Sequence, residues 1–228
     1  MMTLPTNIKH LSAIGSDEVG VGDYLAPLVV TSVYVEAHQI EALHALGVKD
    51  SKSMTDKRIC EIASHIKEML PHKTVVFENK YYNAMIDKGL NAHVVKSFLH
   101  NKTLSELTRH LPEYPAYLIV DEFASKENHF KYLNQLPKKP DILEKNVYFV
   151  KKGESVHIAV AAASILARAA FVTYMKQLSQ QLDMDILKGA SAKVDTCARN
   201  LVKKHGEAFF KDLCKWHFAN TKRVLGGH

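Results

Sequence analysis

The sequence predicts an α/β fold in which a five-stranded mixed sheet is flanked by helices and followed by a helical C-terminal lobe. Five short runs of β-branched and aromatic residues alternate with longer stretches of helical character. Such alternation is typical of layered α/β domains. Three of the runs are followed closely by acidic residues, at the strand ends where open α/β sheets bind ligands. No comparable run appears after residue 187.

The predicted strands are short apolar segments bounded by polar or acidic residues. The second of them, LVVTSVYV, is rich in β-branched residues and is expected to lie beside the first in the sheet. The expected strands cover residues 11–17, 28–35, 74–78, 117–121 and 147–150.

The predicted helices are defined mainly by their start and stop signals. Thr55 can cap one helix and Pro71 ends it, while Gly89 separates two others. A long helix that includes Glu154 is apolar nearly all round beyond its first turn, so it is expected to be buried. The expected helices cover residues 37–46, 55–70, 82–88, 91–110, 126–136 and 154–181, with two or three more after Gly189.

Composition and charge narrow the class of protein. With 46% hydrophobic and 24% charged residues, the 228-residue chain resembles an ordinary globular protein, and we expect one domain over 1–228. The longest apolar stretch, 156–172, contains Arg168, so we expect no membrane partner. Three widely spaced cysteines are typical of reduced thiols, and we expect a cytoplasmic protein.

The positive charge is concentrated near the C-terminus. Residues 188–228 hold nine Lys or Arg against three Asp or Glu, which accounts for the whole net charge of +6. A basic lobe beside a carboxylate-rich centre favours a polyanion partner such as nucleic acid. A solvated basic helix face is an equally simple explanation of the charge alone.

Acidic residues follow three predicted strands, and together they suggest a metal site. Asp17 and Glu18 follow the first strand, Asp121 ends the fourth, and Glu154 lies just beyond the fifth. Four carboxylates that converge repel one another unless they bind cations. Oxygen ligands suit Mg²⁺ or Mn²⁺, and a pair of such ions supports phosphodiester hydrolysis. Taken singly, each acid has a simpler explanation, such as a solvated turn or a helix N-terminal acid.

Several further motifs, in order along the chain, resemble the type 2 ribonuclease H family, and within it bacterial ribonuclease HIII. The resemblance runs from residue 11 to about 225. The matching segments are GSDEVG at 15–20, GDY at 22–24, GVKDSK at 47–52, VD at 120–121, ES at 154–155, His157, AVAAASI at 159–165, KGA at 188–190, KVD at 193–195 and HFANT at 217–221.

The resemblance implies a ribonuclease H-like fold and a monomeric endoribonuclease. Such an enzyme cleaves the RNA strand of RNA–DNA hybrids, leaving 5′-phosphate and 3′-hydroxyl ends. The family's catalytic and metal-binding carboxylates match Asp17, Glu18, Asp121 and Glu154, which would hold two Mg²⁺ or Mn²⁺ ions. We expect Asp17 to bridge both ions.

The resemblance also implies substrate contacts. A glycine-flanked turn grips the ribose 2′-hydroxyl, the group that separates RNA from DNA. Val21 stands where the family commonly has a polar residue. The candidate substrate-binding residues are Gly20, Val21, Gly22, Lys49, Ser51, Lys52, Ser164, Lys188 and Lys193.

The sequence departs from ribonuclease HIII at its N-terminus. The first strand begins near Leu11, so we expect that the N-terminal domain resembling the TATA-box-binding protein is lacking. Two alternatives stay open: an enzyme of type HII that incises at single ribonucleotides in duplex DNA, and a non-catalytic nucleic-acid-binding module.

Overall fold

A five-stranded sheet forms the centre of the fold in the computed structural model, which describes residues 3–49, 51 and 54–226. The strand order is β3-β2-β1-β4-β5, and β4 runs parallel to both β1 and β5. The pairing places Ser16 beside Val120 and Asp121 beside Val150, so the carboxyl ends of these strands lie together. The strands are β1 (Ala13–Val19), β2 (Leu28–Val35), β3 (His72–Phe77), β4 (Leu118–Asp121) and β5 (Val147–Val150).

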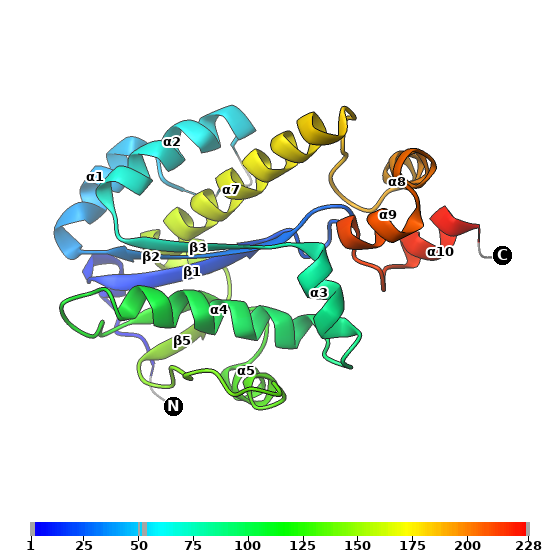
Figure 1. Ribbon diagram of the computed structural model, residues 1–228. Coiled ribbons are helices and arrows are strands. Elements are labelled where there is room, and N and C mark those ends of the chain that lie inside the picture. Colours follow the sequence, from blue (N-terminus) through cyan, green and yellow to red (C-terminus); the bar gives the residue numbers. More distant parts are fainter. Residues whose placement is uncertain (1–2, 50, 52–53, 227–228) are drawn as a thin grey trace. The chain divides into compact units, whose positions relative to one another are not determined.

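The helices follow one another along the chain largely in the order that the sequence predicts (Figure 1). They are η1 (Ile8–His10), η2 (Ala37–Gln39), α1 (Ile40–Leu46), α2 (Asp56–Met69), α3 (Asn79–Ile86), α4 (Ala92–Thr108), α5 (Lys126–Leu133), α6 (Gly153–Val156), α7 (Ile158–Leu182), α8 (Ala192–His205), α9 (Glu207–Leu213) and α10 (Ala219–Leu225).

The chain divides into two compact units, and the first comprises residues 1–19, 30–75 and 92–169. Figure 1 shows α1 and α2 on one side of the sheet and α4 on the other. On the α4 side, Ile14, Leu104 and Val120 share one apolar cluster, and the alanines of early α7 belong to the cluster that contains α1 and α2. Burial of these apolar faces is the main driving force for this layered packing.

Gly15 allows α7 to approach β1 closely. A Cβ atom at this position would lie 2.2 Å from the backbone of Ala159 and of Val160, a distance that no side chain can occupy. The glycine and the small residues of α7 therefore bring the start of this helix against the strand that carries Asp17.

The second unit comprises residues 20–29, 76–91 and 170–228. The Tyr24 ring lies within about 6 Å of both Phe210 and Phe218. Two asparagines of α3 bind the end of α9 and the residue after it, because Asn79 donates to the Leu213 carbonyl and Asn83 to the Cys214 carbonyl. The single domain over 1–228 stays a prediction.

The predicted elements are largely confirmed, but the long helix is not continuous. The sequence predicts one helix over 154–181, whereas α6 and α7 are separated at His157, whose backbone is extended. The His157 Nδ1 accepts a hydrogen bond from the Ala159 N–H, and its Nε2 bonds the Leu11 carbonyl. This buried histidine therefore breaks the helix and satisfies a backbone donor at the start of α7.

α7 is long and apolar enough to cross a membrane by length and composition alone. In this structure, however, 67% of its most apolar window is buried inside the protein, which is the pattern of a core helix.

Candidate active site

Four carboxylates line one cleft in the first unit. Asp17 and Glu18 lie near the end of β1, Asp121 ends β4, and Glu154 lies in α6 after β5. The parallel pairing of β1, β4 and β5 brings these positions to the same edge of the sheet. The cleft has a volume of about 410 Å³ and is lined by Asp17, Glu18, Val19, Ser51, Asp121, Glu154, Ser164 and Arg168.

Asp17 is the most buried of the four, with 9% of its surface exposed. Burial, followed by the negative charges of Glu18 and Asp121, raises the pKa of its carboxyl to about 7. Hydrogen bonds from the Ser164 hydroxyl and the Glu18 N–H oppose that shift but do not cancel it. The carboxylate form of Asp17 is therefore destabilised unless a cation lies nearby.

Glu18 is held by two side chains of α4. Its carboxylate lies 2.9 Å from the His100 Nε2 and 3.3 Å from the Lys96 Nζ. Burial raises the pKa of Glu18, but the hydrogen bond and charge of His100, followed by those of Lys96, bring it below the ordinary value. Glu18 is therefore ionised and oriented, in contrast to Asp17.

Lys96 and His100 are not among the site residues predicted from the sequence. They are four residues apart, and each directly follows a buried apolar residue, Val95 or Leu99. This spacing is the available signal that both lie on the buried face of a helix. The His100 Nδ1 also lies 2.8 Å from the Ser16 hydroxyl, which gives a Ser–His–Glu series. Ser16 is fully buried, so it cannot act as a nucleophile toward a substrate.

Asp121 is linked to the turn that carries Glu154. Its Oδ1 accepts a 2.7 Å hydrogen bond from the Gly153 N–H. A Cβ atom on Gly153 would lie 3.0 Å from Val160 and 3.3 Å from that same Oδ1. The small residue before Glu154 therefore allows α6 to pack directly against the end of β4.

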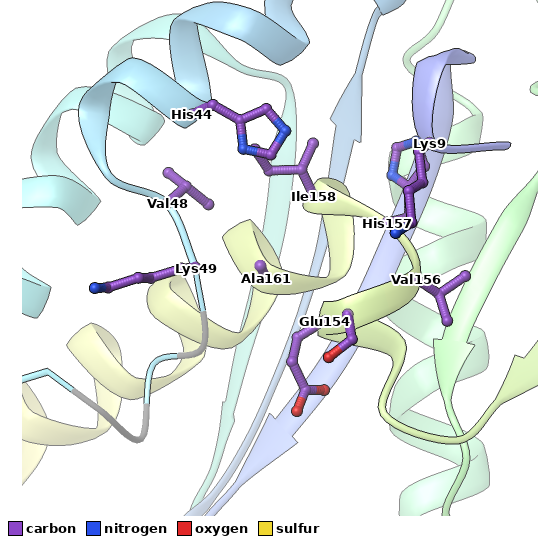
Figure 2. A pocket seen from close by; sticks show the side chains of 10 residues that line it. Lys9, His44, Val48, Lys49, Glu154, Val156, His157, Ile158 and Ala161 are labelled. Atoms are coloured by element: carbon purple, nitrogen blue, oxygen red, sulfur yellow. The ribbon is translucent and has the colours of Figure 1, made fainter. Parts of the chain in front are cut away.

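Glu154 also borders a second pocket, of about 300 Å³. Figure 2 shows Glu154 of α6, His44 of α1 and Lys49 of the following loop around it. Lys49 is exposed and lines this second pocket. This predicted substrate contact therefore lines the same pocket as Glu154.

Ser51 and Ser164 join the loop before α2 to α7. Their hydroxyl oxygens are 2.9 Å apart, and both residues line the carboxylate cleft. Arg168, which the sequence analysis did not consider as a site residue, donates to the Ser51 carbonyl and pairs with Asp56 at 2.9 Å. Lys52, the remaining candidate of this loop, lies outside the described residues.

The remaining predicted substrate contacts lie in the second unit, where Gly20, Val21 and Gly22 form a tight turn. The Asp23 N–H donates to the Gly20 carbonyl at 3.3 Å, and Gly20 has a φ of 94°. A Cβ atom on Gly20 would lie 2.1 Å from the Pro27 carbonyl oxygen, so the turn requires glycine there.

Two lysines named from the sequence lie elsewhere in this unit. Lys188 is exposed beside Gly189, and Lys193 is exposed in the first turn of α8. The Gly189 N–H donates to the Asp23 carboxylate at 2.6 Å. The glycine turn and the loop that contains Lys188 are therefore directly connected.

The donor set of the cleft suits a hard divalent cation. All four acids offer oxygen, the ligand that Mg²⁺ and Mn²⁺ prefer, and the hydrogen bonds to Asp17 do not cancel the repulsion around it. Within the described ranges, no three carboxylate, imidazole or thiol side chains already form a compact metal-binding group.

Comparison with known proteins identifies the family. The family model for ribonuclease HII matches residues 14–221. Ribonuclease HIII of Bacillus mycoides is 44% identical over 222 residues, covering 97% of this chain and 70% of that protein. A ribonuclease HIII of Bacillus cereus is 43% identical over 224 residues, with coverage of 98% and 71%.

Solved structures agree with these relatives. Bst-RNase HIII in complex with Mn²⁺ is 43% identical, with a TM-score of 0.90 over 95% of this chain and 70% of that one. Ribonuclease H2 from Pyrococcus horikoshii OT3, at 19% identity, matches with a TM-score of 0.75 over 94% of this chain and 97% of that one. The second likeness establishes the fold alone.

Proposed function

This chain belongs to the ribonuclease HII family, with ribonuclease HIII proteins among its relatives, and on that premise we propose that it cleaves the RNA strand of RNA–DNA hybrids. The chain is accordingly a ribonuclease H, an endonuclease that hydrolyses phosphodiester bonds. The products expected are 5′-phosphate and 3′-hydroxyl ends.

The observation that carries this proposal is the cleft with four carboxylates. Asp17, Glu18, Asp121 and Glu154 would together hold two Mg²⁺ or Mn²⁺ ions, and a related structure contains Mn²⁺. When bound, such ions supply a nucleophilic water and neutralise charge on the phosphate. Asp17 is the member whose burial and charged neighbours most favour a cation.

The chain's own residues prepare this chemistry by fixing the acids. His100 and Lys96 hold Glu18 in its ionised form, and the Gly153 N–H orients Asp121. Ser164 donates to Asp17 and bonds Ser51, so the hydroxyl connects the metal-binding edge to the loop before α2. The acids are therefore positioned before any substrate arrives, which reduces the reorganisation needed for reaction.

Membership of the ribonuclease HII family also suggests which residues contact the substrate. The turn of Gly20, Val21 and Gly22 would bind the ribose, while Lys49, Ser51, Lys52, Ser164, Lys188 and Lys193 would contact phosphates. We also propose a cytoplasmic location, because Cys60, Cys197 and Cys214 are free thiols. A monomer stays a prediction.

The experiment that tests this function offers two labelled substrates side by side. One is a continuous RNA–DNA hybrid and the other is duplex DNA with a single ribonucleotide, each with Mg²⁺, Mn²⁺ or chelator. We expect metal-dependent cleavage within the hybrid, with 5′-phosphate ends. Incision of the single-ribonucleotide duplex alone, or cleavage that persists in chelator, would overturn the proposal.

A further inference from the structure

Lys215 is a fully buried lysine in the short segment between α9 and α10. Its ammonium donates to the carbonyls of Gly20, Asp23 and Ala26. A lysine ammonium has three N–H donors, so each donor has one backbone acceptor. These acceptors span the turn that contains Val21 and Gly22.

A buried ammonium is costly, which makes its location informative. Burial lowers the pKa of Lys215 to about 7, while the negative charge of Asp23 raises it in opposition. The three carbonyl acceptors also favour the charged form. Burying a charge costs stability. The best-attested reason for a protein to keep one is that the charge enforces one specific conformation.

The direction of the Gly20 carbonyl fixes the direction of the Val21 N–H, which belongs to the same peptide. The peptide between Gly20 and Val21 is trans, so its C=O and N–H point to opposite sides. Because the Gly20 carbonyl points at the buried Lys215, the Val21 N–H points away from it. Val21 is 37% exposed, so a ligand can reach this residue of the turn.

The peptide between Asp23 and Tyr24 follows the same rule. Its carbonyl binds Lys215, and its N–H donates in the other direction to the Gly189 carbonyl at 2.9 Å. One lysine therefore organises both the glycine turn and its connection to the loop of Lys188.

Lys215 is itself held firmly. Its backbone N–H donates to the Tyr24 carbonyl at 2.9 Å. On either side of it, the Cys214 carbonyl accepts from the Asn83 side-chain amide, and the Trp216 N–H donates to the oxygen of that same amide. The ammonium is thus presented from a fixed backbone, which is what precise positioning requires.

We propose that Lys215 is a positioning residue for substrate selection, which holds three carbonyls inward so that the Val21 N–H faces outward as a donor for a ribose hydroxyl. This inference rests on the proposed function, because it assumes that the turn meets the RNA strand. A deoxyribose lacks the acceptor and would gain nothing from this donor.

The first test compares Lys215→Met with Lys203→Met, which removes the same charge from an exposed position of α8. Hybrid cleavage is measured with plain duplex DNA of the same sequence as a competing inhibitor. For Lys215→Met we expect KM for the hybrid to rise about tenfold, the worth of one well-made hydrogen bond. We expect kcat to fall less, and the inhibition constant of DNA to match that of Lys203→Met.

Two results would overturn the inference while leaving the proposed function intact. One is an unchanged KM for the hybrid in Lys215→Met, and the other is an equal loss of affinity for hybrid and DNA. If the wild-type protein fails to cleave the hybrid at all, it is the proposed function that fails.

A second measurement needs no variant, in case Lys215→Met does not fold. Amide hydrogen exchange of the wild-type protein is followed in chelator, free and saturated with hybrid or with DNA. The hybrid should protect the Val21 amide and the DNA should leave it exchanging. Equal protection by both, or protection by neither, would contradict the role given to this turn.

Discussion

At the residue scale, Asp17 is a carboxyl whose ionised form the fold does not balance. Its carboxyl is nine-tenths buried beside Glu18 and Asp121, and its pKa is raised from 3.8 to about 7. Glu18, its neighbour in the chain, has a lowered pKa because His100 and Lys96 face it. Asp17 and Glu18 are adjacent in the chain, but they differ in charge state because their tertiary contacts differ.

The raised pKa of Asp17 predicts how the metal-free protein responds to pH. Between pH 4 and 7 the folded protein keeps a proton on Asp17 that the unfolded chain has lost, so stability falls as pH rises through this window. At pH 8, Asp17→Asn should stabilise the metal-free protein by about 2 kcal/mol, or roughly 4–8 °C in Tm.

Thermal melts with and without Mn²⁺ check this expectation. Mn²⁺ should raise the Tm of the wild-type protein more than that of Asp17→Asn, and the benefit of the substitution should vanish near pH 4. A metal-free Asp17→Asn variant that melts below the wild type at pH 8 would contradict the account of this carboxyl.

His100 is predicted to act through Glu18. Replacing it with alanine removes the 2.9 Å contact that orients this carboxylate, so His100→Ala should lower cleavage about 10–100-fold and require more Mn²⁺. His65→Ala, at an exposed position of α2, is the matched control. The prediction fails if both variants show the same metal dependence as the wild type.

At the scale of elements, the sequence predicts strands better than it predicts helix breaks. β2 and β5 have the predicted bounds because β-branched runs with polar ends favour strands strongly. The break between α6 and α7 was not predicted, because the apolar pattern continues through His157 without glycine or proline. The His157 side chain stabilises this break through its bond to the Leu11 carbonyl and the bond that it accepts from the Ala159 N–H.

The same contrast applies to the site. The four acids were found from the sequence because strand ends are readable, and the structure places them around one cleft. Lys96, His100 and Lys215 were not found, since their partners are distant in the chain. Lys215 was even counted with the solvated basic lobe, although it is fully buried.

Gly15 is predicted to set the distance between β1 and α7. Gly15→Ala would place a methyl group against the backbone of Ala159 and Val160, so we expect a loss of about 2–3 kcal/mol in the free energy of unfolding. Gly22→Ala is the control for stability, because a Cβ atom there meets nothing within 4 Å. Denaturant unfolding that gives equal stabilities would refute this packing role.

At the scale of the whole molecule, the charge of residues 188–228 predicts salt-dependent binding. Some of its nine cations are engaged within the protein, because Lys215 binds carbonyls and Arg223 pairs with Asp195. We therefore expect the logarithm of hybrid affinity to fall with the logarithm of salt at a slope of about −3 to −5. Anisotropy titrations across salt concentrations measure this slope, and a flat line would exclude a phosphate-binding role.

The central claim, that four carboxylates bind the metal ions for hybrid cleavage, is tested most directly by four single amide variants. Hybrid cleavage in Mn²⁺ is measured for Asp17→Asn, Glu18→Gln, Asp121→Asn and Glu154→Gln beside the wild type. Each variant should cleave more than about 100-fold more slowly than the wild type. That loss exceeds the one usually seen when a residue that only supports a metal ligand is replaced. Near-wild-type cleavage by any of the four would contradict the assignment of that carboxylate, and by Asp17→Asn would contradict the account as a whole.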